Sequence, residues 1–424
     1  MSQEWLLYNG RPIASALVLA HDSELKRLRA LTPAAAPIGV VVGDPAYDRM
    51  LASRQLRMHY RQALAVEPHQ KLIVLCTTWS HRSLLGSWPE LFRELVACLP
   101  RDEYRLAGLI HPNVWHGHGA LQVKTWLADA RRAGLTLIGP TEGWQAVLLA
   151  ADLIVGDFGA TTCYGASQDL PVLLAAFPDA EVAADSVGEC LGALAPRLNR
   201  YETLRTQIES TLEDHQLGRF APVRELMSSH PGAAIERLRA LCYRHLCLSV
   251  PDTAPVTPVI PPELVTIPRP EILADHLTCT PTGPAEYTIE RYPAGIAIDR
   301  ATADHLDRAF LVVHENHPQR SLLNEAPVVL VTSPAAGQDP ETVLDAVLRR
   351  LPAAQVVALT SGTNQVISTR RGHRIILRGS DIGMAAGMVY EWLLTGTSEL
   401  PGEWDIITGR KRTTFVLGDF RDAS

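Results

Sequence analysis

One turn between a short apolar strand and a helix combines residue types that bind anions. The strand is expected at residues 153–155, the turn is Gly156-Asp157-Phe158-Gly159, and Ala160-Thr161-Thr162 begins the helix. The first N–H groups of a helix have no intrahelical acceptor, and together with the helix dipole they attract negative charge, most often phosphate. Turns of this kind also occur in α/β proteins that bind nothing there, so the turn alone leaves both interpretations open.

Three more polar motifs lie next to predicted strands. Thr77-Thr78-Trp79 follows the apolar run 71–76, His111-Pro112-Asn113 follows the run 105–110, and Glu142 precedes the helix in front of residue 153. In an open parallel sheet, ligands bind in the crevice outside the carboxyl ends of the strands. Several polar motifs at one sheet edge are stronger evidence for a binding site than a single turn.

The elements that position these motifs alternate between strand and helix. The strands are continuous apolar runs, which is typical of a parallel sheet covered by helices on both faces. We therefore predict an α/β fold. The predicted strands are 16–20, 38–42, 71–76, 105–110, 135–138 and 153–155. The predicted helices include 22–31, 88–98 and 120–132, with a polar, amphipathic segment at 47–64 and trailing helices at 201–217 and 233–246.

A proline-rich run at residues 249–270 is the clearest domain boundary. We divide the chain into a larger α/β domain with trailing helices at 1–248, a linker at 249–285 and a smaller α/β domain at 286–424. The strands expected in the last domain are 310–313, 328–331, 355–359, 374–377 and 414–417, and its helices are 341–350 and 382–394.

The composition of the chain bears on its ligands and on the cell compartment in which we expect it. A net charge of -7 gives no support to nucleic-acid binding. The 7 cysteines are scattered and odd in number, which favours a reducing compartment over a disulfide framework. The first residues lack a basic segment, and no apolar window is long enough to span a bilayer. We expect a cytoplasmic protein and leave open a peripheral place at the inner membrane face.

The ordered motifs resemble the nucleotide-binding half of CDP-glycerol glycerophosphotransferases, the GT-B enzymes of teichoic-acid synthesis. Gly43-Asp44-Pro45 with Asp48, Thr77-Thr78-Trp79, residues 109–113 and residues 149–162 carry this resemblance over about residues 15–180. It implies a GT-B-like, Rossmann-like parallel sheet domain followed by the smaller α/β domain. In that family an Asp-Tyr-Ser-Ser turn holds the pyrophosphate; here the turn reads Asp-Phe-Gly-Ala from Asp157.

The resemblance implies a role for each motif. His111 would be the catalytic residue, donating to a phosphate or ribose oxygen of the donor, although it could instead only cap the strand end. Thr161 and Thr162 would bond the pyrophosphate, with helix capping as the alternative. No cofactor and no metal is required, because the helix end and the imidazole stabilise the leaving charge.

The remaining motif residues would complete the donor site. Thr77 and Thr78 would line the nucleotide pocket beside Trp79, for which a place in the core is the favoured alternative. Glu142 would accept hydrogen bonds from the ribose hydroxyls of the donor, or it would only cap its helix. Asp157 is expected to orient the turn, with Gly159 beside it. His111, His116 and His118 are close in sequence, but no cysteine or carboxylate accompanies them at metal-site spacing, so we expect no metal there.

The leading hypothesis is a transferase that uses a nucleotide-activated donor, CDP-glycerol or a UDP-sugar, in cell-wall or capsule polymer synthesis. In the family, the general base lies in a His-Gly element of an N-terminal domain, which neither Tyr8-Asn9-Gly10 nor His21 matches. The gene start could lie upstream, the C-terminal domain could form the second wall of the cleft, or the chain could be a non-catalytic nucleotide-binding or assembly protein. A UDP-sugar 2-epimerase is a further alternative. Enzyme activity, a membrane-bound acceptor and a homo-oligomer stay open.

Overall fold

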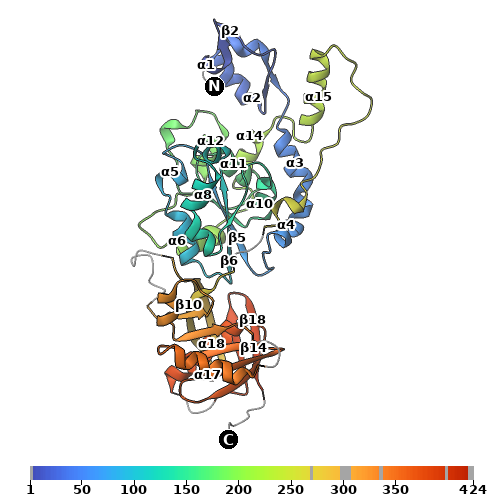
Figure 1. Cartoon of the computed structure of the whole chain (residues 1–424). Helices are drawn as coiled ribbons and strands as arrows, with labels where there is room; N and C mark the ends of the chain where they lie inside the picture. The colour runs from blue at the N-terminus through green and yellow to red at the C-terminus, as the bar shows by residue number, and fades with distance from the viewer. Residues whose placement is uncertain (1–2, 268–270, 297–306, 334–337, 397–399, 419–424) are drawn as a thin grey trace.

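Three structural units follow one another along the molecule in this computed structural model (Figure 1). The structure describes the chain apart from residues 1–2, 268–270, 297–306, 334–337, 397–399 and 419–424. We call the units the N-terminal unit (residues 3–42), the sheet unit (residues 43–265) and the barrel unit (residues 274–417). No helix in the described part is long and apolar enough to cross a membrane.

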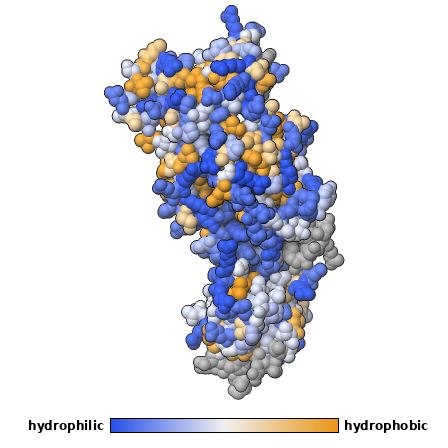
Figure 2. Space-filling model, turned by 180° about the vertical axis from the view of Figure 1, so that it is seen from behind, coloured by the Kyte–Doolittle hydropathy of each residue, from blue (hydrophilic) through white to orange (hydrophobic). Residues whose placement is uncertain are grey.

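The N-terminal unit is built on one strand–helix–strand crossover. Strands β3 (Leu17–Leu19) and β4 (Gly39–Val41) pair in parallel, and helix α2 (Asp22–Leu31) connects them, as the sequence predicted. The other elements are α1 (Gln3–Leu6), β1 (Leu7–Tyr8), β2 (Arg11–Pro12) and the 3-10 helix η1 (Pro33–Ile38). Apolar side chains remain exposed here, Trp5 and Tyr8 among them, and apolar patches lie on the upper part of the surface in Figure 2.

The sheet unit contains five parallel strands in the order β7-β6-β5-β8-β9. Alternate residues of the central strand point to opposite faces: Leu72 and Val74 enter one hydrophobic core, and Ile73 and Leu75 enter the other. The predicted parallel sheet with two covered faces is confirmed. The strands are β5 (Lys71–Thr77), β6 (Tyr104–Ile110), β7 (Thr136–Leu137), β8 (Leu153–Gly156) and β9 (Val172–Leu174).

Helices cover both faces of this sheet (Figure 1). Those of one face are α3 (Pro45–Ser53), α4 (Arg57–Ala63), α10 (Trp144–Ala150), α11 (Ala160–Ser167), α12 (Val187–Leu194) and α14 (Ala221–Met227). Those of the other are α5 (Leu84–Ser87), α6 (Leu91–Cys98), α7 (Pro112–His118), α8 (Ala120–Trp126), α9 (Ala128–Arg132) and α13 (Leu204–Glu213). The remaining ones are η2 (Arg54–Leu56), η3 (Asp179–Glu181), α15 (Ala234–His245) and η4 (Pro262–Val265).

Strand order reverses between β5 and β8, which are neighbours in the sheet although β6 and β7 lie between them in sequence. The connections after β5 and after β8 therefore leave in opposite directions. This opens a crevice at the carboxyl edge of the sheet, where ligands of open α/β sheets bind.

Residues expected as a linker are partly structured. Ile260 is fully buried against the sheet unit, where its carbonyl accepts from Tyr60 Oη at 2.8 Å and its N–H donates to Ser53 Oγ at 3.0 Å. Farther along, the range 249–285 contains strand β10 (Ala274–Gly283), so the extended connection ends earlier than expected.

The barrel unit is a closed nine-stranded barrel of mixed parallel and antiparallel pairs, a closed form of sheet that the expected smaller α/β domain did not specify. Helix α18 (Ile382–Thr395) is buried nearly all round, and all nine strands contribute residues to the core around it. Helices α16 (Arg320–Glu325) and α17 (Pro340–Arg350) pack in a separate core. The other strands are β11 (Glu286–Pro293), β12 (Phe310–His314), β13 (Val328–Val331), β14 (Val356–Ser361), β15 (Asn364–Thr369), β16 (Arg374–Arg378), β17 (Glu403–Thr408) and β18 (Lys411–Leu417).

Buried ion pairs join the barrel unit to the amino end of the sheet. Arg101 lies 2.7 Å from Asp275, and Arg291 lies 2.6 Å from Asp102, just before β6. Burial raises the pKa of the Asp102 carboxyl, but the hydrogen bonds and charge of Arg291 outweigh this and hold it below its ordinary value. This junction is at the edge of the sheet opposite the crevice, so the structure does not favour the alternative in which the C-terminal domain forms the second wall of the cleft.

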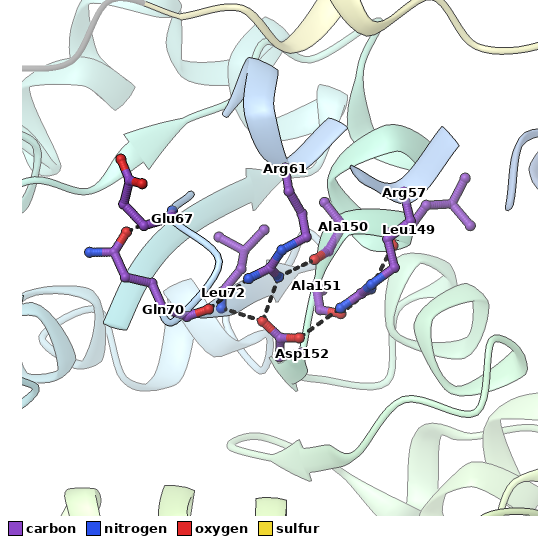
Figure 3. A network of polar contacts seen from close by, with 9 residues as sticks. All are labelled: Arg57, Arg61, Glu67, Gln70, Leu72, Leu149, Ala150, Ala151 and Asp152. Atoms are coloured by element: carbon purple, nitrogen blue, oxygen red, sulfur yellow. Dashed lines mark hydrogen bonds and ion pairs between the residues drawn. The ribbon is translucent and has the colours of Figure 1, made fainter. Parts of the chain in front are cut away.

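A second charged network fixes α4 to the start of β8 (Figure 3). The Asp152 carboxylate accepts from Arg57 at 2.6 Å, from Arg61 at 2.7 Å and from the N–H of Leu72 at 2.7 Å. The Arg61 side chain is only 7% exposed, and the Asp152 carboxylate is the counter-charge of this buried guanidinium.

The substitution Asp152→Asn removes the counter-charge of the buried Arg61 guanidinium. We expect a loss of about 2 kcal/mol, which lowers the midpoint of thermal unfolding of the sheet unit by roughly 5 °C. The matched control is Asp129→Asn, because Asp129 pairs with Arg132 on the surface and such pairs contribute about 0–1 kcal/mol. Calorimetric scans that show equal shifts for both variants would contradict this assignment.

Candidate functional site

A cavity of about 370 Å³ lies at the carboxyl edge of the sheet, where the strand order reverses. We call it the switch-point cavity. Its walls come from the ends of β5 and β6, from the loop before α10 and from the first turn of α11. The lining residues are Thr77, Thr78, Leu109, Ile110, His111, Pro112, Gly139, Pro140, Trp144, Phe158, Gly159, Ala160, Thr161 and Tyr164.

The amino end of α11 borders this cavity, with Gly159, Ala160 and Thr161 in the lining. Gly159 is the N-cap residue, and helix geometry leaves the N–H groups of Ala160 and Thr161 without intrahelical acceptors. A Cβ on Gly159 would lie 2.9 Å from Thr78 Cβ and 3.0 Å from Asp157 Oδ1. The close approach of the two loops therefore requires glycine at this position.

Asp157 holds these two loops together. Its Oδ2 accepts from the N–H of Thr78 at 2.8 Å and from the N–H of Leu84 at 2.9 Å, and its Oδ1 accepts from the N–H of Gly159 at 2.9 Å. The side chain is fully buried. Burial raises the pKa of the carboxyl, and the three backbone hydrogen bonds partly offset this effect. Asp157 thus shapes the turn and does not line the cavity.

His111 is the N-cap residue of α7 and lines the same cavity. Its Nδ1 accepts from the N–H of Asn113 at 3.1 Å. Because Nδ1 is the acceptor, the proton of the neutral ring is on Nε2. Burial lowers the pKa of His111 below its ordinary value, so the ring is neutral near pH 7. The arrangement provides an Nε2–H donor at the end of β6.

The structure brings together five of the residues that the motifs singled out. Thr77, Thr78, His111, Gly159 and Thr161 all line the switch-point cavity. Thr77 is itself buried, and its Oγ1 accepts from the N–H of Leu85 at 3.0 Å, so it supports the loop after β5.

Two other predicted residues lie elsewhere. Thr162 is fully buried and faces Gly156, where an added Cβ would lie 2.4 Å from Thr162 Oγ1. Its side chain therefore packs under the turn, which leaves Thr161 as the hydroxyl at the cavity. Glu142 is exposed just before α10 and is not part of the cavity lining.

An aromatic pair that the motif search did not identify forms part of the cavity wall. The rings of Trp144 and Tyr164 lie 5.0 Å apart, and Tyr164 Oη donates a short hydrogen bond to Asp44. Burial raises the pKa of the Tyr164 hydroxyl, and the nearby Asp44 charge adds to this effect. The sequence did contain a signal that Trp144 is near the site: it is the first residue of α10 and follows Glu142 by two positions.

A second cavity, of about 640 Å³, lies beside the first. We call it the tryptophan cavity because Trp79 and Trp126 both line it. Trp79 is 55% exposed, so the interpretation of this residue as part of the core is wrong. The Trp79 and His111 rings, 6.5 Å apart, stand where the two cavities adjoin. Within the described residues, no group of three metal-ligating side chains is found.

Comparisons with known proteins give a distant likeness. No protein-family model and no curated protein matches the chain. Solved structures with similarity include the wall teichoic acid polymerase TagF, at 11% identity and a TM-score of 0.40, covering 55% of this chain and 58% of the polymerase. The chain thus spans little more than half of that protein.

Two further solved structures are similar to this chain with lower TM-scores. A glycosyltransferase from Rickettsia africae has 12% identity and a TM-score of 0.34, covering 57% of this chain and 65% of that one. Anabaena Alr3699/HepE in complex with UDP has 16% identity and a TM-score of 0.32, covering 55% of this chain and 64% of that one. Likeness at this level carries no weight for function, which depends on the site itself.

The substitution Asp157→Ala leaves three backbone N–H groups without their acceptor. Each buried N–H left unpaired costs about 1–3 kcal/mol, so we expect a large loss of stability and faster amide hydrogen exchange at Thr78, Leu84 and Gly159. Asp157→Asn keeps one acceptor oxygen and should be intermediate, and Thr77→Ser, which retains the hydroxyl, is the control. Unchanged exchange at these three amides in Asp157→Ala would contradict the role given to the carboxylate.

Proposed function

We propose that the sheet unit binds the diphosphate of a nucleotide-activated donor in the switch-point cavity, and that the protein is a transferase that uses this donor. The observation that carries the proposal is the convergence of the α11 amino end, His111 and Thr161 on one cavity. Phosphate groups bind helix amino ends because the unpaired N–H groups and the helix dipole both favour negative charge.

The donors around the cavity suit a diphosphate. The N–H groups of Ala160 and Thr161 and the Nε2–H of His111 are hydrogen-bond donors, and the Thr161 hydroxyl, which also bonds the Cys76 side chain, lines the same cavity. Among the described residues of the lining, none is aspartate or glutamate. Asp157 and Asp44 both bond to lining residues, and both carboxylates are occupied: Asp157 accepts from backbone N–H groups, and Asp44 accepts from the Tyr164 hydroxyl and from backbone N–H groups of α3.

The nucleoside would lie toward Trp144 and Tyr164. A cavity of about 370 Å³ falls within the range of small-molecule sites, and an indole face can stack on a nucleobase. Glu142 is exposed at the start of α10, from where its carboxylate would accept hydrogen bonds from the ribose hydroxyls.

In the transfer step, the acceptor oxygen forms a bond to the donor group while the bond from that group to the nucleoside mono- or diphosphate breaks. The hydroxyl proton passes to solvent, and negative charge develops on the departing phosphate. The α11 amino end and His111 stabilise that charge without a metal. CDP-glycerol is the first donor to test and a UDP-sugar the second; the product would then be a cell-wall or capsule polymer made at the inner membrane face. A 2-epimerase fits less well, since it needs carboxylates that the described cavity lining lacks.

The second candidate function is nucleotide binding without transfer. It is favoured by the composition of the switch-point cavity: among the described residues that line it, His111 is the single imidazole and there is no carboxylate to act as general base. Incubation with CDP-glycerol or UDP-N-acetylglucosamine separates the two functions. Release of CMP or UDP that requires an acceptor indicates transfer, and binding without release under every acceptor condition indicates a binding protein.

Nucleotide binding should depend on pH through His111. A bound phosphate stabilises the imidazolium and raises its pKa, so the protein takes up a proton on binding, and affinity for CDP or UDP should increase as pH falls from about 7.5 to about 5.5. The terminal phosphate itself titrates near pH ~6, and His111→Gln is the reference for that effect. Protonation of the phosphate weakens binding as pH falls, so calorimetry across this range should show that the ratio of the native affinity to the His111→Gln affinity increases as pH falls. Failure of CDP, UDP and both donors to bind at about 1 mM would overturn the proposal.

Gly159→Ala should disrupt the anion site while leaving the fold in place. The added Cβ forces Thr78 or Asp157 away from the turn, so we expect nucleotide affinity to decrease about tenfold or more. Gly117→Ala is the matched control, because a Cβ there meets no atom within 4 Å. Equal nucleotide affinities in the two variants would count against the placement of the diphosphate at α11.

A further inference from the structure

We infer that the tryptophan cavity is a carbohydrate subsite, which takes a neutral sugar ring of the acceptor beside the nucleotide. The assignment rests on the proposed function for its place in the reaction, but the binding chemistry comes from the cavity itself. Trp79 and Trp126 are 55% and 47% exposed, and both line this cavity of about 640 Å³.

The chemistry of the lining favours a neutral and amphipathic ligand. Among the described residues that line the cavity there is no lysine, arginine, aspartate or glutamate, so a phosphate or an amine would find no counter-charge in this lining. Indole faces bury apolar C–H surface, and the hydroxyl, amide and imidazole groups of Ser80, Asn113 and His118 can bond hydroxyls. A sugar ring presents both kinds of surface at once.

The tryptophan cavity has a rigid wall. Ser80 has a φ of 138°, an unusual value for a residue with a side chain, and its carbonyl accepts from Ser83 Oγ at 2.8 Å. Ser83 Oγ in turn accepts from the N–H of Gly86 at 3.1 Å. A Cβ on Gly86 would lie 2.2 Å from the Ser80 carbonyl oxygen, so this loop is closely packed.

Trp126 is also held in place. His118 meets it edge-on with 4.9 Å between ring centroids, and Val114 and Leu127, which share the lining, are buried. An aromatic side chain fixed by its neighbours loses little conformational freedom when a ligand stacks on it. The cavity is thus preorganised for a ring-shaped ligand.

One carboxylate links the two cavities. Asp157 Oδ2 accepts from the N–H of Thr78, which lines the switch-point cavity, and from the N–H of Leu84, which lies between two residues that line the tryptophan cavity. Trp79 follows Thr78 directly. An acceptor sugar in the tryptophan cavity would therefore lie next to the nucleotide-activated donor in the switch-point cavity.

The test uses the indole N–H signals of the full chain in nuclear magnetic resonance spectra. The chain has 8 tryptophans, so each can be assigned by substitution. Methyl glucoside and N-acetylglucosamine, added to about 20 mM because single-ring binding is weak, should shift the Trp79 and Trp126 signals. The signal of Trp5, an exposed tryptophan of the N-terminal unit, should not move. CDP and UDP, in contrast, should shift Trp144.

Trp126→Ala should weaken glycoside binding about tenfold or more and leave the affinity for CDP and UDP unchanged, since Trp126 does not line the switch-point cavity. His118→Ala, which removes the edge contact, should weaken it less, and Trp5→Ala is the matched control. The subsite is disproved if no glycoside shifts Trp79 and Trp126, or if cytidine or uridine shifts them instead. If glycosides bind there but no nucleotide shifts Trp144, the subsite stands and the proposed donor site fails.

Discussion

The buried carboxylate of Asp157 is the contact on which the site depends. It accepts N–H groups from the loop after β5, from the start of α5 and from the turn after β8. These N–H groups lie in loops or in the first turn of a helix, where no backbone acceptor is provided, and water cannot reach them because the carboxylate is fully buried. One side chain therefore fixes how the α11 amino end and the tryptophan-bearing loop stand relative to each other.

Strand order explains why this contact lies where it does. β5 and β8 are neighbours in the sheet although other strands separate them in sequence. The loop after β5 and the loop after β8 therefore begin side by side and then lead to opposite sides of the sheet. The barrel unit packs on the opposite edge through Arg101 and Arg291, and it leaves both cavities open. The N-terminal unit is on the cavity side, and Asp44, just after it, accepts from the Tyr164 hydroxyl. The strand order thus determines where the switch-point cavity lies, and the side chains determine what it can bind.

The sequence predicted the sheet unit better than the barrel unit, for a physical reason. Strands such as β5 are continuous apolar runs because they are buried on both faces, and that pattern is local. β10 and β11 alternate polar and apolar residues and follow a proline-rich run, so no strand was predicted there, and barrel closure depends on pairs far apart in sequence. Likewise, only helix phase in the folded chain separates Thr161, at the cavity, from Thr162, under the turn.

The central claim is that the α11 amino end and His111 bind the diphosphate of a nucleotide. A crystal structure of the protein with CDP or UDP tests it most directly. The account predicts a phosphate within hydrogen-bond distance of the N–H groups of Ala160 and Thr161 and of His111 Nε2, with the base toward Trp144. A nucleotide bound at any other place, with the α11 amino end occupied by water alone, would contradict it.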